Sequence, residues 1–174
     1  MAKVFLTGGS GFLGGALLKA LQERGDEVVA LARSDAAAAS LGTAQVVRGD
    51  TLDEGAMAEG MRGCDIVFHV AGMNTMCPTD PLEMIHINVR GAEAAVRATA
   101  RAGIKRLVLT SSASSLGEER GTVGNEDSPH RGWYMSVYER SKREGDDLIA
   151  ALLQRLQQGA AEKPTPAGEE DLRH

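Results

Sequence analysis

The residues of this sequence best suited to chemistry are a serine, a tyrosine and a lysine in its second half. Tyr138 and Lys142 are four positions apart in a stretch with helical apolar spacing, so both side chains lie on one helix face. The ammonium of Lys142 favours the phenolate form of Tyr138, and a tyrosine tuned in this way can act as a general acid or base. Ser112 can hold the oxygen of a carbonyl or an alcohol. Together the three residues predict proton transfer at such an oxygen.

A glycine-rich turn near the N-terminus predicts a dinucleotide site. The apolar run Val4–Leu6 is typical of a buried strand, and apolar residues at helical spacing follow the turn. Gly8 allows the tight turn, Gly11 lets a diphosphate approach the backbone, and Gly14 lets the helix pack closely on the strand. The exposed amides at the start of that helix suit phosphate groups. The alternatives are a glycine turn without a ligand and, for Tyr138 and Lys142, an amphipathic helix with a solvated lysine.

Apolar runs alternate with helical patterns along the chain. This alternation predicts an α/β fold, a doubly wound parallel sheet (Rossmann-like) of about five strands. Further strands are expected at 27–32, 45–48, 64–70 and 106–110. Helices are expected at 36–41, from about 49, from an Asp80-Pro81 start to about 102, and through Tyr138 to a stop at 157–159.

Candidate ligand-binding residues follow each of these strands. Ligands of parallel sheets lie at the carboxyl ends of the strands. Gly8, Arg33, Asp50, Ala71 and Ser112 all occupy such positions. Five separate segments therefore predict one site at one edge of the sheet, where the hydride of a nicotinamide would move to or from its C4 and Lys142 would bond the nicotinamide ribose.

The residues after the second strand bear on cofactor choice. An arginine there pairs with the 2′-phosphate of NADP, whereas an acidic residue accepts from the 2′-hydroxyl of NAD. Arg33 comes first, which favours NADP, with NAD as the alternative because Asp35 follows. Arg33 could also simply be solvated. Asp50 is expected to accept from the adenine amino group, and Asp50 and Thr51 also fit helix N-caps.

Six segments in a fixed order resemble one family, the extended short-chain dehydrogenase/reductases of the NAD(P)-dependent epimerase/dehydratase group. They are TGGSGFLG (Thr7–Gly14), GDTLD (Gly49–Asp53), HVAG (His69–Gly72), INVRG (Ile87–Gly91), TSSAS (Thr110–Ser114) and YERSK (Tyr138–Lys142), within residues 2–153. The resemblance implies an NAD(P)-dependent oxidoreductase or epimerase with Ser112, Tyr138 and Lys142 as catalytic residues. It gives Asn88 a role in structure or proton relay, with a buried amide as the alternative.

The motifs also imply which residues contact the cofactor. These are Gly8, Gly11, Phe12, Leu13, Gly14, Arg33, Asp50, Thr51, Val70, Ala71, Gly72, Thr110, Tyr138 and Lys142. His69 is expected to be a satisfied strand residue. Leu116 stands where many sugar-nucleotide enzymes of this group carry tyrosine. This difference favours the group's reductases of ketones and of hydroxysteroid-like or flavonoid-like substrates.

The C-terminal residues depart from the family pattern. Residues 1–158 are expected to form the NAD(P)-binding domain, and 159–174, with two prolines and several charges, a disordered tail. Family members continue into a sixth strand and a substrate domain, so we expect a truncated chain in which the substrate domain is missing and strand five is a sheet edge. A dinucleotide-binding module without turnover is therefore the alternative function.

Composition limits the partners. The net charge is −5 with no basic block, which argues against nucleic acid and anionic membranes and leaves a small-molecule substrate. No apolar segment has membrane-spanning length. Cys64 and Cys77 are expected to be reduced thiols in a cytoplasmic protein, and the scattered histidines predict no metal site. A small-residue face formed by Ala94, Ala95 and Ala98 would permit a homodimer, with a monomer as the alternative.

Overall fold

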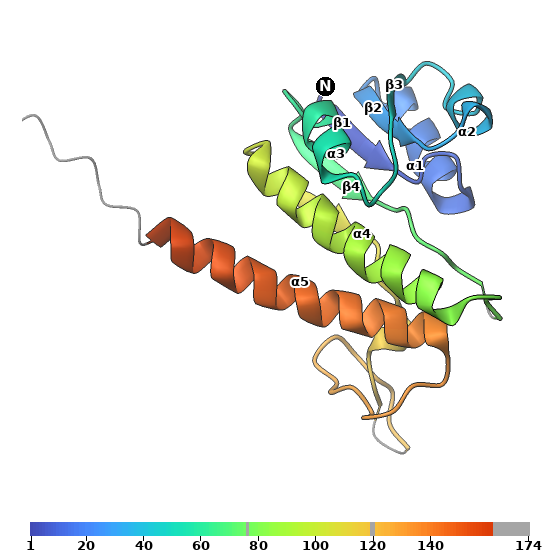
Figure 1. Cartoon of the computed structure of the whole chain (residues 1–174), viewed down its shortest axis with the longest axis vertical. Coiled ribbons are helices and arrows are strands. Elements are labelled where there is room, and N and C mark those ends of the chain that lie inside the picture. The colour runs from blue at the N-terminus through green and yellow to red at the C-terminus, as the bar shows by residue number, and fades with distance from the viewer. Residues whose placement is uncertain (76, 119–120, 162–174) are drawn as a thin grey trace, which may run out of the picture.

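The computed structural model describes residues 1–75, 77–118 and 121–161. Here five parallel strands form one sheet in the order β3-β2-β1-β4-β5, with helices on both faces (Figure 1). The strands are β1 (Lys3–Thr7), β2 (Glu27–Ala32), β3 (Gln45–Arg48), β4 (Ile66–His69) and β5 (Leu107–Leu109). The helices are α1 (Phe12–Glu23), α2 (Asp35–Ala39), α3 (Glu54–Gly60), α4 (Pro81–Arg101) and α5 (Val137–Ala161), with a 3-10 turn at Ala113–Ser115. The doubly wound α/β prediction is confirmed.

Alternation along β1 divides the core between the two faces of the sheet. Val4 and Leu6 point to the face covered by α1 and α2, where they pack with Leu18, Leu21 and Leu41. Phe5, which lies between them, points to the opposite face, covered by α3 and α4. The core on that face consists of Phe5, Val29, Leu31, Met57, Ala58, Met61, Cys64, Val67, Ala94, Ala95 and Ala98. Because both faces are covered, the side chains alternate between faces while the strand is buried without a break from Val4 to Thr7.

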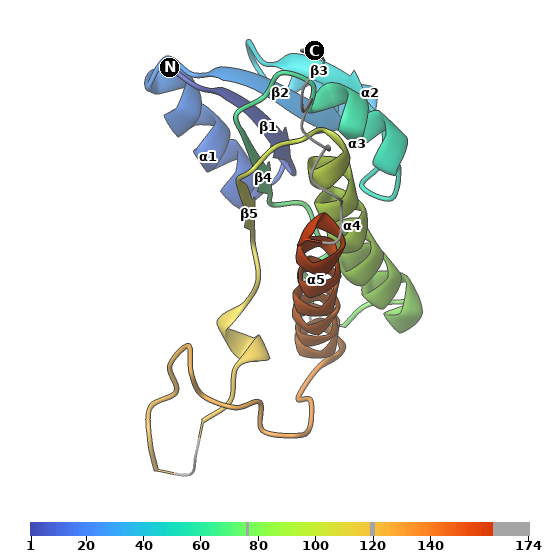
Figure 2. The ribbon, with the colours of Figure 1, turned by 90° about the vertical axis from the view of Figure 1, so that its left-hand side faces the viewer.

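Helices α4 and α5 lie side by side, as both views show (Figures 1 and 2). Ala92 and Val96 of α4 meet Ile149 and Leu152 of α5 in a third apolar cluster, which also contacts β5. This packing fixes α5, and with it the predicted catalytic side chains, relative to the carboxyl end of the sheet.

The alanine face of α4 does not lie on the surface. Ala94, Ala95 and Ala98 are buried in the core against the sheet, beside Phe5 and Val67. The face therefore makes the helix-on-sheet contact that was the alternative to a dimer contact. A homodimer therefore stays a prediction, and the alanine face of α4 no longer supports it.

Several element ends differ from the sequence predictions. α3 begins at Glu54 with Asp53 as its N-cap, so the expected helix start at 49 and the capping roles of Asp50 and Thr51 were wrong. Asp50 instead accepts a hydrogen bond from the Leu52 amide, closing a local turn before the helix. α5 continues to Ala161, past the expected stop.

Two other expectations are confirmed. Asp80 caps α4 by accepting from the amides of Leu82 and Glu83, and Pro81 occupies the first turn. β5 is an edge of the sheet. The predicted disorder of the tail falls mostly on residues 162–174, which lie outside the described residues. Within the described ranges, none of the helices is both long enough and apolar enough to cross a membrane.

Candidate active site

The glycine turn after β1 has a backbone that side chains would disrupt. Gly8 has φ +77, and a Cβ there would lie 2.6 Å from the amide nitrogen of Ala71. A Cβ at Gly14 would overlap the carbonyl oxygen of Gly8, which also accepts the Gly11 amide at 2.9 Å. The turn therefore touches the end of β4 on one side and the first turn of α1 on the other. Gly8 and Gly14 have the conformational and packing roles that their spacing predicted.

The N-terminus of α1 is open to a phosphate group. Its N-cap is Gly11, which has no side chain to satisfy the first amides, and Phe12 and Leu13 are exposed. Unsatisfied amides and the positive end of a twelve-residue helix together suit an anion. The glycine turn has no space for side chains at Gly8 and Gly14, and the helix start beside it is uncapped. Together these two features fit the diphosphate of a dinucleotide.

The carboxyl ends of β2 and β3 carry the residues expected to bind the adenosine half. Arg33 is exposed, and its guanidinium lies 4.0 Å from the carboxylate of Asp50. Asp35 instead pairs with Arg48, so its carboxylate is already engaged. Thr51 lies against α4, where a Cβ at Gly91 would come within 3.3 Å of its hydroxyl. Arg33 and Asp50 are thus brought together at this edge, while Asp35 is drawn to β3.

A polar link joins the ends of β1 and β4. The hydroxyl of Thr7 lies 2.9 Å from Nδ1 of His69 and accepts the amide of Ala71 at 3.2 Å. Burial, followed by the charge of Lys142, lowers the pKa of His69 to about 4, so its ring is neutral at physiological pH. His69 is a satisfied strand residue. The link holds the Val70–Gly72 segment against the glycine turn.

Lys142 reaches the same edge from α5. Its ammonium donates to the carbonyl oxygen of Thr110 at 2.9 Å and lies 5.9 Å from the ring centre of Tyr138. A Cβ at Gly72 would lie only 3.5 Å from Lys142 Nζ, so the lysine adjoins the strand end that borders the glycine turn. Burial lowers the pKa of Lys142, and the charge of Asp146 partly opposes this shift.

Ser112 begins the 3-10 turn after β5. Its hydroxyl accepts the amide of Ser114 at 3.2 Å and lies 2.8 Å from the Ser114 hydroxyl. Ser112 and Tyr138 are both half-buried, so a substrate oxygen could reach either of them. Ser112 lies on the segment that leaves the carboxyl end of β5, and Tyr138 lies in the first turn of α5, as predicted.

Asn88 makes three hydrogen bonds within the protein. It donates to the carbonyl of Met73 and the hydroxyl of Ser141, and accepts the amide of Met73 at 2.7 Å. These bonds fasten the segment after β4 to α4 and α5. They favour the structural role for Asn88, and proton relay stays a prediction.

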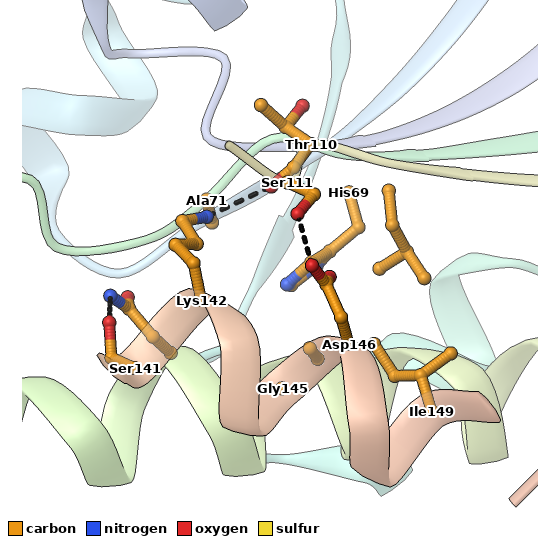
Figure 3. Close-up of a pocket in the computed structure, with 12 residues that line it drawn as sticks. His69, Ala71, Thr110, Ser111, Ser141, Lys142, Gly145, Asp146 and Ile149 are labelled. Carbon is orange, nitrogen blue, oxygen red and sulfur yellow. Dashed lines mark hydrogen bonds between the residues drawn. The ribbon is translucent and has the colours of Figure 1, made fainter. Parts of the chain in front are cut away.

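A small cavity of about 20 Å³ lies between the ends of β4 and β5 and the helices α4 and α5. Figure 3 shows Lys142 and Asp146 pointing toward it from α5, with Ser111 hydrogen-bonded to Asp146 at 2.6 Å. Sequence reasoning missed both Ser111 and Asp146. The available signal was the spacing, because Asp146 is four residues after Lys142 and shares its helix face.

A second set of residues missed from the sequence docks the segment before α5. Glu139 is 1% exposed and accepts the Met135 amide at 2.8 Å. Its other carboxylate oxygen lies 3.6 Å from His130 and 3.7 Å from Arg131. Arg131 also donates to the carbonyl of Leu116. A buried carboxylate next to Tyr138 in sequence therefore anchors residues 130–135 on the first turn of α5.

Comparison with known proteins gives a family for this arrangement. The model of the NAD dependent epimerase/dehydratase family matches residues 4–158, most of the chain. The chain belongs to this family. The match spans every segment on which the resemblance rested, from the glycine turn to the helix of Tyr138 and Lys142.

Curated relatives in the family include reductases and dehydrogenases. The chain is 36% identical to a 4-hydroxy-2-methyl-3-oxo-4-farnesyl-3,4-dihydroquinoline-1-oxide ketoreductase of Stigmatella aurantiaca, covering 84% of this chain and 45% of that protein. It is 30% identical to a 3 beta-hydroxysteroid dehydrogenase/Delta 5→4-isomerase of Mycobacterium tuberculosis, covering 87% and 43%. The chain therefore spans about half the length of the curated relatives it matches.

Solved structures of the family share this architecture. The UDP-glucose-4-epimerase from Stenotrophomonas maltophila, crystallised with NAD and formylated UDP-arabinopyranose, is 29% identical and matches with a TM-score of 0.74. The match covers 90% of this chain and 50% of the epimerase. The part of the fold shared with the epimerase is the sheet and the helices that carry the candidate site.

Proposed function

We propose that this chain binds a nicotinamide dinucleotide, with NADP preferred to NAD, and supports hydride transfer to or from a carbonyl or alcohol carbon. The observation that carries the proposal is a continuous series of contacts along the carboxyl edge. Gly8 adjoins Ala71, and Gly72 in turn adjoins Lys142 of α5. A dinucleotide whose diphosphate lay on the glycine turn would thus extend toward Tyr138 and Lys142.

The proposed roles of the residues follow from their positions. The amides near Phe12 and Leu13 bind the diphosphate, and the small residues Ala71 and Gly72 leave room for the cofactor across the end of β4. When bound, the nicotinamide supplies or accepts the hydride. Tyr138 donates or removes the proton on the substrate oxygen.

Ser112 and Lys142 support that proton transfer. The Ser112 hydroxyl orients the substrate oxygen. The Lys142 ammonium stabilises the phenolate of Tyr138 and bonds the nicotinamide ribose. Thr110, through its carbonyl oxygen, keeps the ammonium at the edge of the sheet.

The preference for NADP rests on the pairing at the ends of β2 and β3. Arg33 is exposed, and its guanidinium lies as far as 4.0 Å from the Asp50 carboxylate, so it is accessible to a 2′-phosphate. Asp35, the residue that would favour NAD, is engaged by Arg48. Arg48 thus competes with a 2′-hydroxyl for the Asp35 carboxylate at an exposed position.

Two observations support a ketone or hydroxysteroid-like substrate class. A relative named as a ketoreductase is 36% identical over 152 residues, and one named as a 3 beta-hydroxysteroid dehydrogenase is 30% identical over 158. Leu116 also follows the 3-10 turn where many sugar-nucleotide enzymes carry a tyrosine. An apolar residue there suits an apolar carbonyl compound better than a sugar.

The test is turnover with NADPH across a panel of ketones and hydroxysteroids, comparing wild type with Tyr138→Phe. Tyr134→Phe is the matched control, because Tyr134 packs on the ring of His130 instead of near Lys142. We expect Tyr138→Phe to lose activity by about 100-fold or more while still binding NADPH, with Tyr134→Phe near wild type. NADPH binding without turnover in wild type would favour the dinucleotide-binding module instead.

A further inference from the structure

Two consecutive residues after β5 hold two residues one turn apart on α5. The carbonyl oxygen of Thr110 accepts from the ammonium of Lys142 at 2.9 Å. The hydroxyl of Ser111 donates to the carboxylate of Asp146 at 2.6 Å. The two pairs lie side by side at the cavity between β5 and α5 (Figure 3).

The cavity is a poor environment for an isolated ammonium. Lys142 is half-buried there, and burial favours its neutral amine. The cavity's lining residues also include Leu109, Ala92 of α4 and Ile149 of α5, which offer no polar atom from their side chains. A neutral amine at Lys142 could not stabilise the phenolate of Tyr138, so the proposed chemistry requires that the proton be kept.

Charges around Lys142 come from few groups. Among the residues lining the cavity, the titratable side chains besides Lys142 are His69 of β4 and Asp146 of α5. His69 is neutral, because its pKa is lowered to about 4. α4 contributes Asn88 and Ala92, which carry no charge. Asp146 is therefore the negative charge among the residues that line this cavity.

We propose that Asp146 is a positioning residue: fixed by Ser111, its carboxylate keeps a counter-charge beside Lys142, so that the amine in the cavity remains an ammonium. This inference rests on the proposed function, because that chemistry is what requires Lys142 to stay an ammonium. It acts through Lys142, since Asp146 is two helical turns, about 12 Å of helix rise, from Tyr138. Because Tyr138 is that far away, the Asp146 carboxylate has little direct effect on the phenol. Lys142 is only one helical turn away, so the carboxylate favours its ammonium form.

The test is the titration of Lys142 in the full chain without cofactor, by NMR of labelled lysine side chains. The chain has five lysines, and Lys142→Arg assigns the resonance. We expect Asp146→Asn to lower the pKa of Lys142 by about one unit. Asp147→Asn is the matched control, because Asp147 follows Asp146 in sequence but pairs with Arg143 instead. This variant should leave the pKa of Lys142 unchanged.

A second variant separates charge from anchoring. Ser111→Ala keeps the Asp146 charge but frees its carboxylate, so it should lower the pKa of Lys142 by less than Asp146→Asn. A wild-type value for Lys142 in Asp146→Asn would overturn the proposal. If Asp146→Asn fails to fold, Ser111→Ala decides, and an unchanged Lys142 there would overturn it.

Failure of the proposed function would be seen separately. Titration of wild type with NADPH, followed by its fluorescence, tests the cofactor site and does not depend on Asp146. Suppose that wild type does not bind NADPH but that Asp146→Asn lowers the pKa of Lys142. This outcome would support the role of Asp146 and reject the proposed function.

Discussion

The hydroxyl of Thr7 and Nδ1 of His69 lie 2.9 Å apart, joining the last residues of two neighbouring parallel strands. The same hydroxyl accepts the amide of Ala71, so the pair also sets the path of the chain as it leaves β4. Because that path borders the glycine turn, the geometry of the candidate site depends on a neutral, buried histidine.

Stability should therefore fall as this histidine becomes protonated. The pKa of His69 is about 4 in the folded chain and about 6.5 in the unfolded one, so only the unfolded chain binds the proton between these values. We expect the free energy of unfolding to drop by about 3 kcal/mol from this group as pH falls from about 6.5 to 4. Urea unfolding at several pH values measures the slope.

Two variants isolate this contribution from that of other groups. His69→Asn, which can keep a polar atom near Thr7, should flatten the pH dependence in this window. His86→Asn, at an exposed position of α4, should not. Equal slopes in wild type and His69→Asn would show that His69 already titrates normally in the fold.

Neighbouring glycines of α1 should respond in opposite ways to alanine. A Cβ at Gly14 would overlap the Gly8 carbonyl, whereas one at Gly15 would lie 3.4 Å from the Gly9 carbonyl, an ordinary contact. We expect Gly14→Ala to destabilise the chain by about 1–3 kcal/mol and to abolish NADPH binding. Gly15→Ala should be neutral or stabilising by up to about 1 kcal/mol. Thermal unfolding and fluorescence titration check both, and a tolerated Gly14→Ala would refute the close packing.

Cofactor preference should depend on Arg33. Arg33→Gln removes the guanidinium that we propose binds the 2′-phosphate, so NADPH should bind about tenfold more weakly while NADH is unaffected. Arg62→Gln is the control, since Arg62 pairs with Glu59 of α3 and not with Asp35 or Asp50. Fluorescence titration with both cofactors measures the ratio. Tighter binding of NADH than NADPH to wild type would contradict the assignment.

The buried carboxylate beside Tyr138 should contribute strongly to stability. Glu139→Gln leaves His130 and Arg131 without their negative partner, so we expect a loss of about 3 kcal/mol in urea unfolding. Glu144→Gln, which breaks the exposed pair with Arg140, should cost less than about 1 kcal/mol. Similar losses in the two variants would mean that Glu139 is not a buried anchor.

The sequence predicted the fold well because its signals are local. Apolar runs of β1 and β2, the glycine turn after β1, and the Asp80-Pro81 start each specify their own element. The alignment of Gly8, Arg33, Asp50, Ala71 and Ser112 at one edge then followed from the parallel sheet. Element ends were less certain where two residues competed, as when Asp53 capped α3 while Asp50 closed a turn.

The tertiary contacts of the site could not be predicted in this way. Ser111 and Asp146 are separated by 35 residues, and only the docking of α5 on β5 brings them together. Glu139 reads as an ordinary polar helix residue until residues 130–135 fold over it. Patterns in sequence locate elements, but pairs such as these depend on how the elements pack.

The central claim is that a nicotinamide ring lies beside Tyr138 when its dinucleotide rests on the glycine turn. Intermolecular nuclear Overhauser effects between NADP⁺ and labelled tyrosine rings test it directly, since the chain has two tyrosines and Tyr134 is an internal control. We predict contacts from the nicotinamide protons to the Tyr138 ring and none to Tyr134. Bound NADP⁺ whose nicotinamide contacts neither ring would contradict the account.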